Sequence, residues 1–179
     1  MKLPIKIGIG LAFLWIAIKM VALAINFSVD DIKIFVFINM FLLTTAIAVS
    51  LYLVKRKETE SNLLNDIKNG MLAGVPYAAI VSIFLYFYYQ NIYPEFNEKK
   101  VHEIELRMKN PKTIKEIQTT NPSMENKTDS EVKRDVIANT KAIYNAKFTL
   151  VISLLALMVY STLNSIVIAM IYRKVVFRN

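Results

Sequence analysis

The sequence predicts an all-α fold: a polytopic membrane protein with four transmembrane helices and an extracytoplasmic helical hairpin between spans three and four. The first observation is that 55% of the 179 residues are hydrophobic although 20% are charged, so the apolar residues must be gathered in blocks. The second is that four such blocks each have about 20 residues, the length that a helix needs to cross a hydrocarbon core of ~30 Å. The blocks run approximately from Ile5 to Phe27, Ile34 to Val54, Met71 to Tyr89 and Phe148 to Tyr172.

These blocks divide the chain into three parts. Residues 1–89 contain the first three transmembrane helices, residues 90–147 form the extracytoplasmic hairpin, and residues 148–179 contain the fourth transmembrane helix and a cytoplasmic tail.

The composition excludes several classes of function. Cysteine is absent, which excludes disulfide scaffolds, thiolate metal sites and a cysteine nucleophile, and His102 is the only histidine. The net charge of +8 is compatible with nucleic-acid binding, but the positive residues cluster at the ends of the apolar blocks, as they do in membrane proteins. We therefore expect contact with the lipid bilayer, and we expect no nucleic acid, cofactor or metal.

The first block resembles a secretory signal, since Lys2 and Lys6 precede it and "ALA" stands at residues 22–24. However, the block is longer than the ~7 to 15 apolar residues of a signal, and Lys19 interrupts the region where cleavage would occur. We expect an uncleaved first span.

Lys19 lies deep inside this first span, where a charge is costly and often functional. Side chains lean toward the N-terminus of their helix, so snorkelling to the nearer surface works against the bond geometry. Three interpretations stay open: snorkelling or a local contact with Asp30, Asp31 or the tyrosines at the end of span three, a subunit contact, and an ion or proton path. Asp30 and Asp31 stand in a tight turn, where Ser28 and Asp31 can cap span two.

The short basic flanks predict that both termini are cytoplasmic. Lys2 and Lys6 precede span one, the basic residues 55–57 follow span two, and Arg173 and Lys174 follow span four. The segment between spans three and four contains eleven Lys and Arg against nine acidic residues. Since long polar segments are translocated largely regardless of charge, this segment does not oppose the prediction.

Small residues spaced by four open span three, at Gly70, Gly74 and Ala78. One face of this helix therefore has almost no side chain, and another helix can approach it closely. Pro76 removes one backbone donor and predicts a kink. Helix packing is the main interpretation of this stretch, and a gating hinge at a transport site is the alternative.

Span three ends in tyrosines, which are typical of a membrane interface where the ring is buried and the hydroxyl is hydrated. They are Tyr86, Tyr88, Tyr89 and Tyr93.

Span four has a similar face. Ser161, Ser165 and Ala169 are spaced by four, and Asn164 beside them can hydrogen-bond to another helix. We expect spans three and four to pack these faces on each other, with a separate subunit as the alternative neighbour.

Two helical stripes lie between spans three and four. In "FNEKKVHEIELRMKN", Val101, Ile104 and Met108 share one stripe, which ends before Pro111. A polar turn around "TTNPSMENKTDS" follows, and we expect the stripe after it to pack against the first; docking on a partner or on the lipid surface is the alternative.

The second stripe begins where Thr128 and Glu131 have the spacing of a capping box. No Gly or Pro lies between Thr128 and Asn179, so we predict one helix of ~45 residues that continues into span four. The residues of its stripe are Val132, Val136, Thr140, Ile143 and Lys147.

The chain thus has two N-terminal spans, a third span that runs into "FYYQNIYPEF", a charged helix, and a last span that reads "STLNSIVIAMIYRK". This order of parts resembles a family of short, four-span bacterial inner-membrane proteins classified only as a domain of unknown function. The resemblance implies the topology and a bacterial inner-membrane location, and it implies no catalytic residue.

Two functions are compatible with these features. The leading hypothesis is a non-enzymatic accessory or scaffold subunit of a cell-envelope membrane complex, with a membrane-protein partner or as a homo-oligomer. The alternative is a small transporter or channel that uses Lys19 and the Pro76 helix break. A membrane-embedded enzyme is third, because the spans contain no paired His, Ser-His or Asp/Glu motif.

Overall fold

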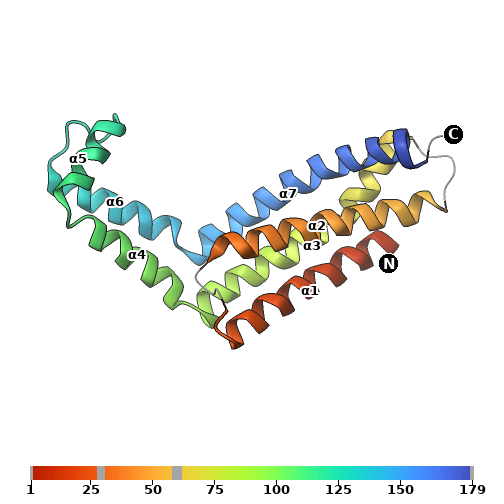
Figure 1. Ribbon diagram of the computed structural model, residues 1–179, viewed down its shortest axis with the longest axis horizontal. Coiled ribbons are helices and arrows are strands. Elements are labelled where there is room, and N and C mark those ends of the chain that lie inside the picture. Colours follow the sequence, from red (N-terminus) through yellow and green to blue (C-terminus); the bar gives the residue numbers. More distant parts are fainter. Residues whose placement is uncertain (1, 28–30, 58–61, 178–179) are drawn as a thin grey trace. The chain divides into compact units, whose positions relative to one another are not determined.

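The computed structural model describes residues 2–27, 31–57 and 62–177, and this part of the chain is all-helical (Figure 1). The long helices are α1 (Leu3–Ala24), α2 (Ile32–Lys55), α3 (Leu63–Phe87) and α7 (Ala146–Ile171). The shorter ones are α4 (Glu95–Arg107), α5 (Pro111–Thr120) and α6 (Asp129–Ile143), and π-helical turns η1 (Tyr88–Ile92) and η2 (Tyr172–Val176) extend α3 and α7.

Four helices are long and apolar enough to cross a membrane, which confirms the predicted fold class. They are Leu3–Ala24, Ile32–Lys55, Leu63–Ile92 and Ala146–Val176. The third helix begins eight residues earlier than the apolar pattern predicted, because the polar segment before Met71 continues the helix. The chain is a multi-pass membrane protein.

The chain forms two compact units. The bundle unit consists of Met1–Phe84 and Val151–Asn179, and the hairpin unit consists of Leu85–Leu150. Most of α3 and α7 belongs to the bundle unit.

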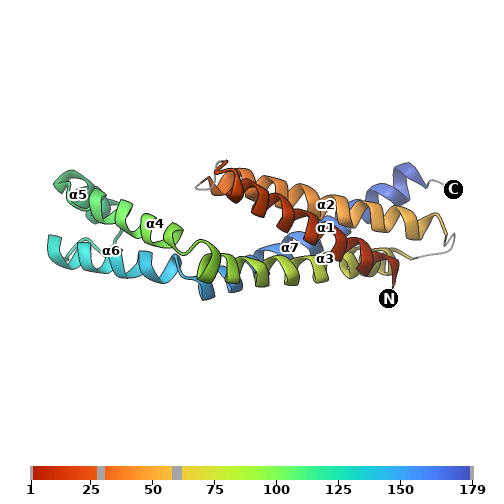
Figure 2. The same ribbon diagram turned by 90° about the horizontal axis from the view of Figure 1, so that it is seen from below.

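In the bundle unit, α1 and α2 lie side by side (Figures 1 and 2). Trp15, the only tryptophan of the chain, is buried where they meet. Its indole N–H donates to the carbonyl oxygen of Phe35 at 3.3 Å, and its ring packs edge-on against Phe84 of α3, with 5.9 Å between centroids. One aromatic side chain therefore joins α1, α2 and α3.

The start of α2 agrees with the capping prediction. Asp31 is the N-cap, and its carboxylate accepts a hydrogen bond from the backbone N–H of Lys33 at 2.9 Å. Ser28 and Asp30, which the sequence placed in the same turn, lie outside the described residues.

In the hairpin unit, α4 and α6 lie side by side, and α5 packs on α6 (Figure 1). The sequence did not predict α5. Ile114 of this helix, Met124 and Val132 form a buried apolar cluster, against which Ile117 and Val136 pack. Helix α5 forms because Asn110 caps it, accepting from Lys112 N–H at 3.0 Å, and Pro111 occupies its first position.

Two of the four tyrosines at the end of span three are more deeply buried than an interfacial belt requires, while Tyr86 and Tyr93 are half-buried. Tyr88 is fully buried and Tyr89 is 9% exposed. Their rings lie edge-on at 5.1 Å, and Tyr89 also contacts Phe96 at 5.1 Å. The ring of Phe96 lies 6.4 Å from that of Tyr144. These aromatic residues form a core at the base of the hairpin unit.

The prediction of one continuous helix from Thr128 to the C-terminus is wrong. Helix α6 ends at Ile143 and α7 begins at Ala146. Tyr144 leaves the helical conformation (φ −83°, ψ 57°), and the Asn145 side chain accepts from the Lys147 N–H at 2.8 Å. An N-capping Asn thus starts a new helix without help from Gly or Pro.

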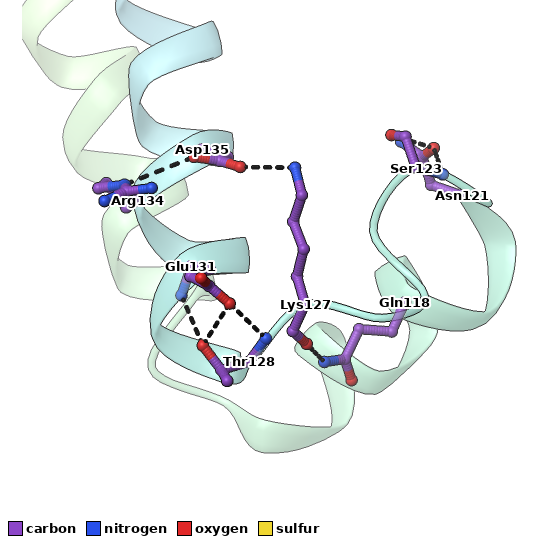
Figure 3. A network of polar contacts seen from close by, with 8 residues as sticks. All are labelled: Gln118, Asn121, Ser123, Lys127, Thr128, Glu131, Arg134 and Asp135. Atoms are coloured by element: carbon purple, nitrogen blue, oxygen red, sulfur yellow. Dashed lines mark hydrogen bonds and ion pairs between the residues drawn. The ribbon is translucent and has the colours of Figure 1, made fainter.

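A polar network orders the turn between α5 and α6 (Figure 3). The capping box of Thr128 and Glu131 is confirmed, with the Thr128 backbone N–H donating to Glu131 at 2.9 Å. Lys127 Nζ pairs with Asp135 at 2.7 Å, while Gln118 donates to the carbonyl oxygen of Lys127 at 2.8 Å.

These contacts have a pH dependence. The backbone hydrogen bond from Thr128 holds the pKa of the Glu131 carboxyl below its usual value, and the hydrogen bond from Lys127 does the same for the pKa of Asp135. Because both pKa values are lowered in the folded state, their stabilisation is present at neutral pH. It is lost as the pH falls through the lowered values.

We predict that Thr128→Ala weakens the start of α6 by about 1 kcal/mol, because it removes the cap of the first-turn N–H groups. The measurement is hydrogen exchange of the α6 amides in the full chain. Thr119→Ala is the control, since the hydroxyl of Thr119 is exposed and bonds to carbonyl oxygens of its own helix. Equal exchange in both variants would contradict the prediction.

Candidate functional site: the polar seam of the membrane bundle

Helices α3 and α7 approach each other through small residues. A Cβ added to Gly70 would lie 2.7 Å from the Ser165 hydroxyl oxygen, and one added to Gly74 would overlap the hydroxyl oxygen of Ser161. Ala78 and Ala169 of the same two helices are buried. The residues that the sequence singled out on spans three and four therefore include two Gly–Ser contacts between these spans, in which the backbone of α3 lies against α7.

Helix α1 approaches α3 in the same way on another face. A Cβ added to Gly8 would overlap the carbonyl oxygen of Ala73, which is a backbone atom. Two residues further along α1, a Cβ added to Gly10 would meet nothing within 4 Å. The two glycines of α1 thus differ in whether they face α3.

Gly8→Ala should destabilise the bundle by about 1 to 3 kcal/mol, because the backbone of α3 must move to admit the methyl group. Gly10→Ala should leave stability unchanged or raise it slightly, since Ala has the higher helix propensity. Thermal unfolding in detergent, followed by the fluorescence of Trp15, compares the two. A similar loss in both variants would contradict the close approach of α1 and α3.

A buried carboxylate joins three helices at the end of the bundle where α3 begins. The side chain of Asp66 is 3% exposed, and its Oδ2 accepts from Lys55 Nζ at 2.8 Å and from the guanidinium of Arg173 at 3.1 Å. Lys55 is the last residue of α2, and Arg173 lies in η2 after α7. The sequence did not predict this ion triad, because Asp66 lies between the second and third apolar blocks. The available signal was the helical pattern around Asp66, which places it one turn before Gly70.

Asp66→Asn should lower the free energy of unfolding by about 3 kcal/mol, because it replaces a buried carboxylate that pairs with two cations by a neutral amide. This value is at the lower end for a broken buried ion pair, since Arg173 is 37% exposed and partly hydrated. Unfolding of the detergent-solubilised chain in added SDS measures the change.

Glu116→Gln is the control for the loss of one negative charge, because Glu116 is exposed. If both variants unfold at the same SDS fraction, the triad does not stabilise the bundle.

Hydrogen bonds between side chains join α2 to α3 and to α7. Tyr77 of α3 donates to the Asn39 side chain at 2.7 Å. Thr44 lies 3.0 Å from the hydroxyl of Tyr160 on α7 and 3.5 Å from the side-chain oxygen of Asn164. Asn164, which the sequence marked as a candidate for bonding across helices, takes part in this cluster. We call these hydrogen bonds and the ion triad of Asp66 the polar seam.

Lys19 is buried in the bundle, with 2% of the residue exposed. Its Nζ lies 3.6 Å from the centre of the Phe35 ring on α2, in a cation–π contact. The side chain thus faces the neighbouring helix instead of lipid. Asp30, one of the two ion-pair partners considered from the sequence, lies outside the described residues.

Pro76 lies inside α3, and the helix continues through it. It lines an open groove of about 670 Å³ beside α3, together with Met71 and Val75. The side chains on this face are apolar except for Lys68 at one end. Tyr77, the next residue, points to the buried side, so Pro76 and the polar seam lie on different faces of the helix.

The seam contains hydroxyls, amides and one ion triad, and its geometry serves helix contact. Among residues 2–27, 31–57 and 62–177, no three His, Asp or Glu side chains gather into a metal site. His102 is exposed in the hairpin unit, 3.8 Å from Glu105.

Fold and seam together define a multi-pass, all-helical membrane protein. Comparison of the chain with models of protein families, with curated proteins and with solved structures finds no match. The resemblance to a bacterial four-span family therefore stays a prediction from the sequence.

Proposed function

We propose that this protein is a non-enzymatic accessory or scaffold subunit of a cell-envelope membrane complex. The observation that carries the proposal is that polar side chains of the bundle bind side chains of neighbouring helices. Asp66, Asn39 and Thr44 each contact side chains of another helix, at distances of 2.7 to 3.5 Å. Groups engaged in this way hold helices together.

The hairpin unit supports the proposal because it is a compact unit with its own apolar cluster. Its surface is rich in charge, with ion pairs along α4 such as Lys100 to Glu103 at 3.0 Å and Arg107 to Glu103 at 2.8 Å. An ordered, charged hairpin attached to a membrane bundle suits contact with another protein of the envelope. A second copy of the chain is the other candidate partner.

The proposal includes the membrane in which the protein lies and the orientation of its termini. We place the protein in the bacterial inner membrane with both termini in the cytoplasm. The basic residues Lys2, Lys57 and Arg173 support this orientation, since they lie at one end of the candidate spans and short basic flanks stay on the cytoplasmic side.

A small transporter or channel is the second candidate, and the burial of Lys19 favours it. An ionisable residue inside a bundle is a common feature of ion and proton paths. The ring of Phe35 covers one side of the ammonium group of Lys19. A role in transport requires that water or a substrate reaches Lys19 during a conformational change.

Two measurements separate the candidates. After extraction of native membranes in a mild detergent, a scaffold subunit should elute with a stoichiometric membrane partner or as a defined homo-oligomer. In liposomes that contain the purified chain alone, it should conduct no ions or protons, and Lys19→Met should change nothing. A monomer whose flux is abolished by Lys19→Met would overturn the scaffold proposal and establish the transport alternative.

A further inference from the structure

We propose that a crevice at the N-terminal end of α1 binds the headgroup of one anionic phospholipid. The crevice has a volume of about 310 Å³ and lies between the first turn of α1, the end of α2 and the second turn of α3. Its polar side chains are Lys2, Lys57 and Asn69, and Leu53 and Val54 are among its apolar ones. We call it the basic crevice.

The charge of the basic crevice is complementary to a phosphate. Two lysines line it, and none of its described lining residues is acidic. Two other cations at this end of the bundle, Lys55 and Arg173, are already engaged by Asp66. Neither Lys2 nor Lys57 has an ion pair with the described residues of the chain. Glu58 and Glu60 follow Lys57 in the sequence, outside the described residues.

The first turn of α1 adds to this charge. It contains no acidic residue, and the side chain of its N-cap, Lys2, makes no capping hydrogen bond. Pro4 has no N–H, so the free donors at the positive end of this helix of 22 residues are the N–H groups of Leu3 and Ile5, which have no side-chain acceptor. An anion near Leu3 would be favoured by the helix dipole as well as by the two lysines.

The apolar part of the crevice selects a lipid over a soluble phosphate. Leu3, Leu53 and Val54 stand beside the two lysines at the ends of two candidate membrane spans. A phospholipid presents its phosphate directly next to acyl chains, which matches this arrangement of charge beside apolar surface. Such a lipid site is compatible with a scaffold subunit and with a transporter alike.

The test uses the full chain in a neutral detergent, where no anionic bilayer surface attracts lipid non-specifically. Native mass spectrometry counts the lipids retained after titration with phosphatidylglycerol. The paired variant Lys2→Gln with Lys57→Gln should lower the affinity by about tenfold or more, since each lysine at an anionic headgroup has a sizeable effect. The matched control is Lys6→Gln with Lys68→Gln, which removes the same charge from exposed lysines outside the crevice, on α1 and α3.

We expect one phosphatidylglycerol bound to the wild-type chain and to the control variant, with phosphatidylcholine bound more weakly. Equal loss in both variants, or equal retention in both, would overturn the proposal. Inorganic phosphate should not displace the lipid at millimolar concentration. If it does, or if phosphatidylcholine binds equally well, the crevice is not a site for an anionic lipid.

Discussion

The close approach of α3 to its neighbours is the constraint on which the bundle depends. Gly8 of α1 lies against the backbone of α3, and Gly70 and Gly74 of α3 lie against Ser165 and Ser161 of α7. In lipid, apolar side chains gain little by leaving their solvent, so helices associate through tight packing and hydrogen bonds. Because α3 offers almost no side chain on these faces, its backbone lies against α1 and α7, and polar side chains at other positions of the bundle reach across from one helix to another.

The polar contacts follow from this packing, and they are distributed along the bundle. Tyr77 bonds to Asn39, Thr44 lies near Tyr160, and Asp66 binds two cations at the basic end. An unsatisfied polar group inside a bilayer is costly, so each contact restricts the register of one helix against another. A longitudinal shift of α3 by one helical turn would separate Asp66 from both cations and place Ala78 or Asp66 where one of the two glycines of α3 now lies. The seam thus specifies one arrangement of the helices.

The sequence predicted the number and type of spans because an apolar run of about 20 residues indicates a helix that crosses a membrane. It also predicted the caps at Asp31 and Thr128, whose signals are local. It missed the role of Asp66, since pairing with Lys55 and Arg173 depends on contacts over long sequence separations. It also missed α5 and the break at Asn145, because a capping Asn starts a helix where no Gly or Pro marks a boundary. A helix cap depends on residues within one turn of each other, so the sequence alone predicts it. A contact between distant helices becomes visible only when the fold is known.

The packing of the bundle also bears on whether Lys19 lines a water path. A lysine that lines a water path keeps its ammonium hydrated, whereas this one lies over the Phe35 ring with almost none of the residue exposed. Pro76 lies on the face of α3 that lines an open groove, and Tyr77 beside it makes the buried contact with Asn39. A hinge at Pro76 that exposed Lys19 would have to alter the packing of Tyr77 and of the neighbouring Gly74. Movement of α3 is therefore coupled to loss of the contacts that hold the bundle together, and this coupling favours a static role for the four helices.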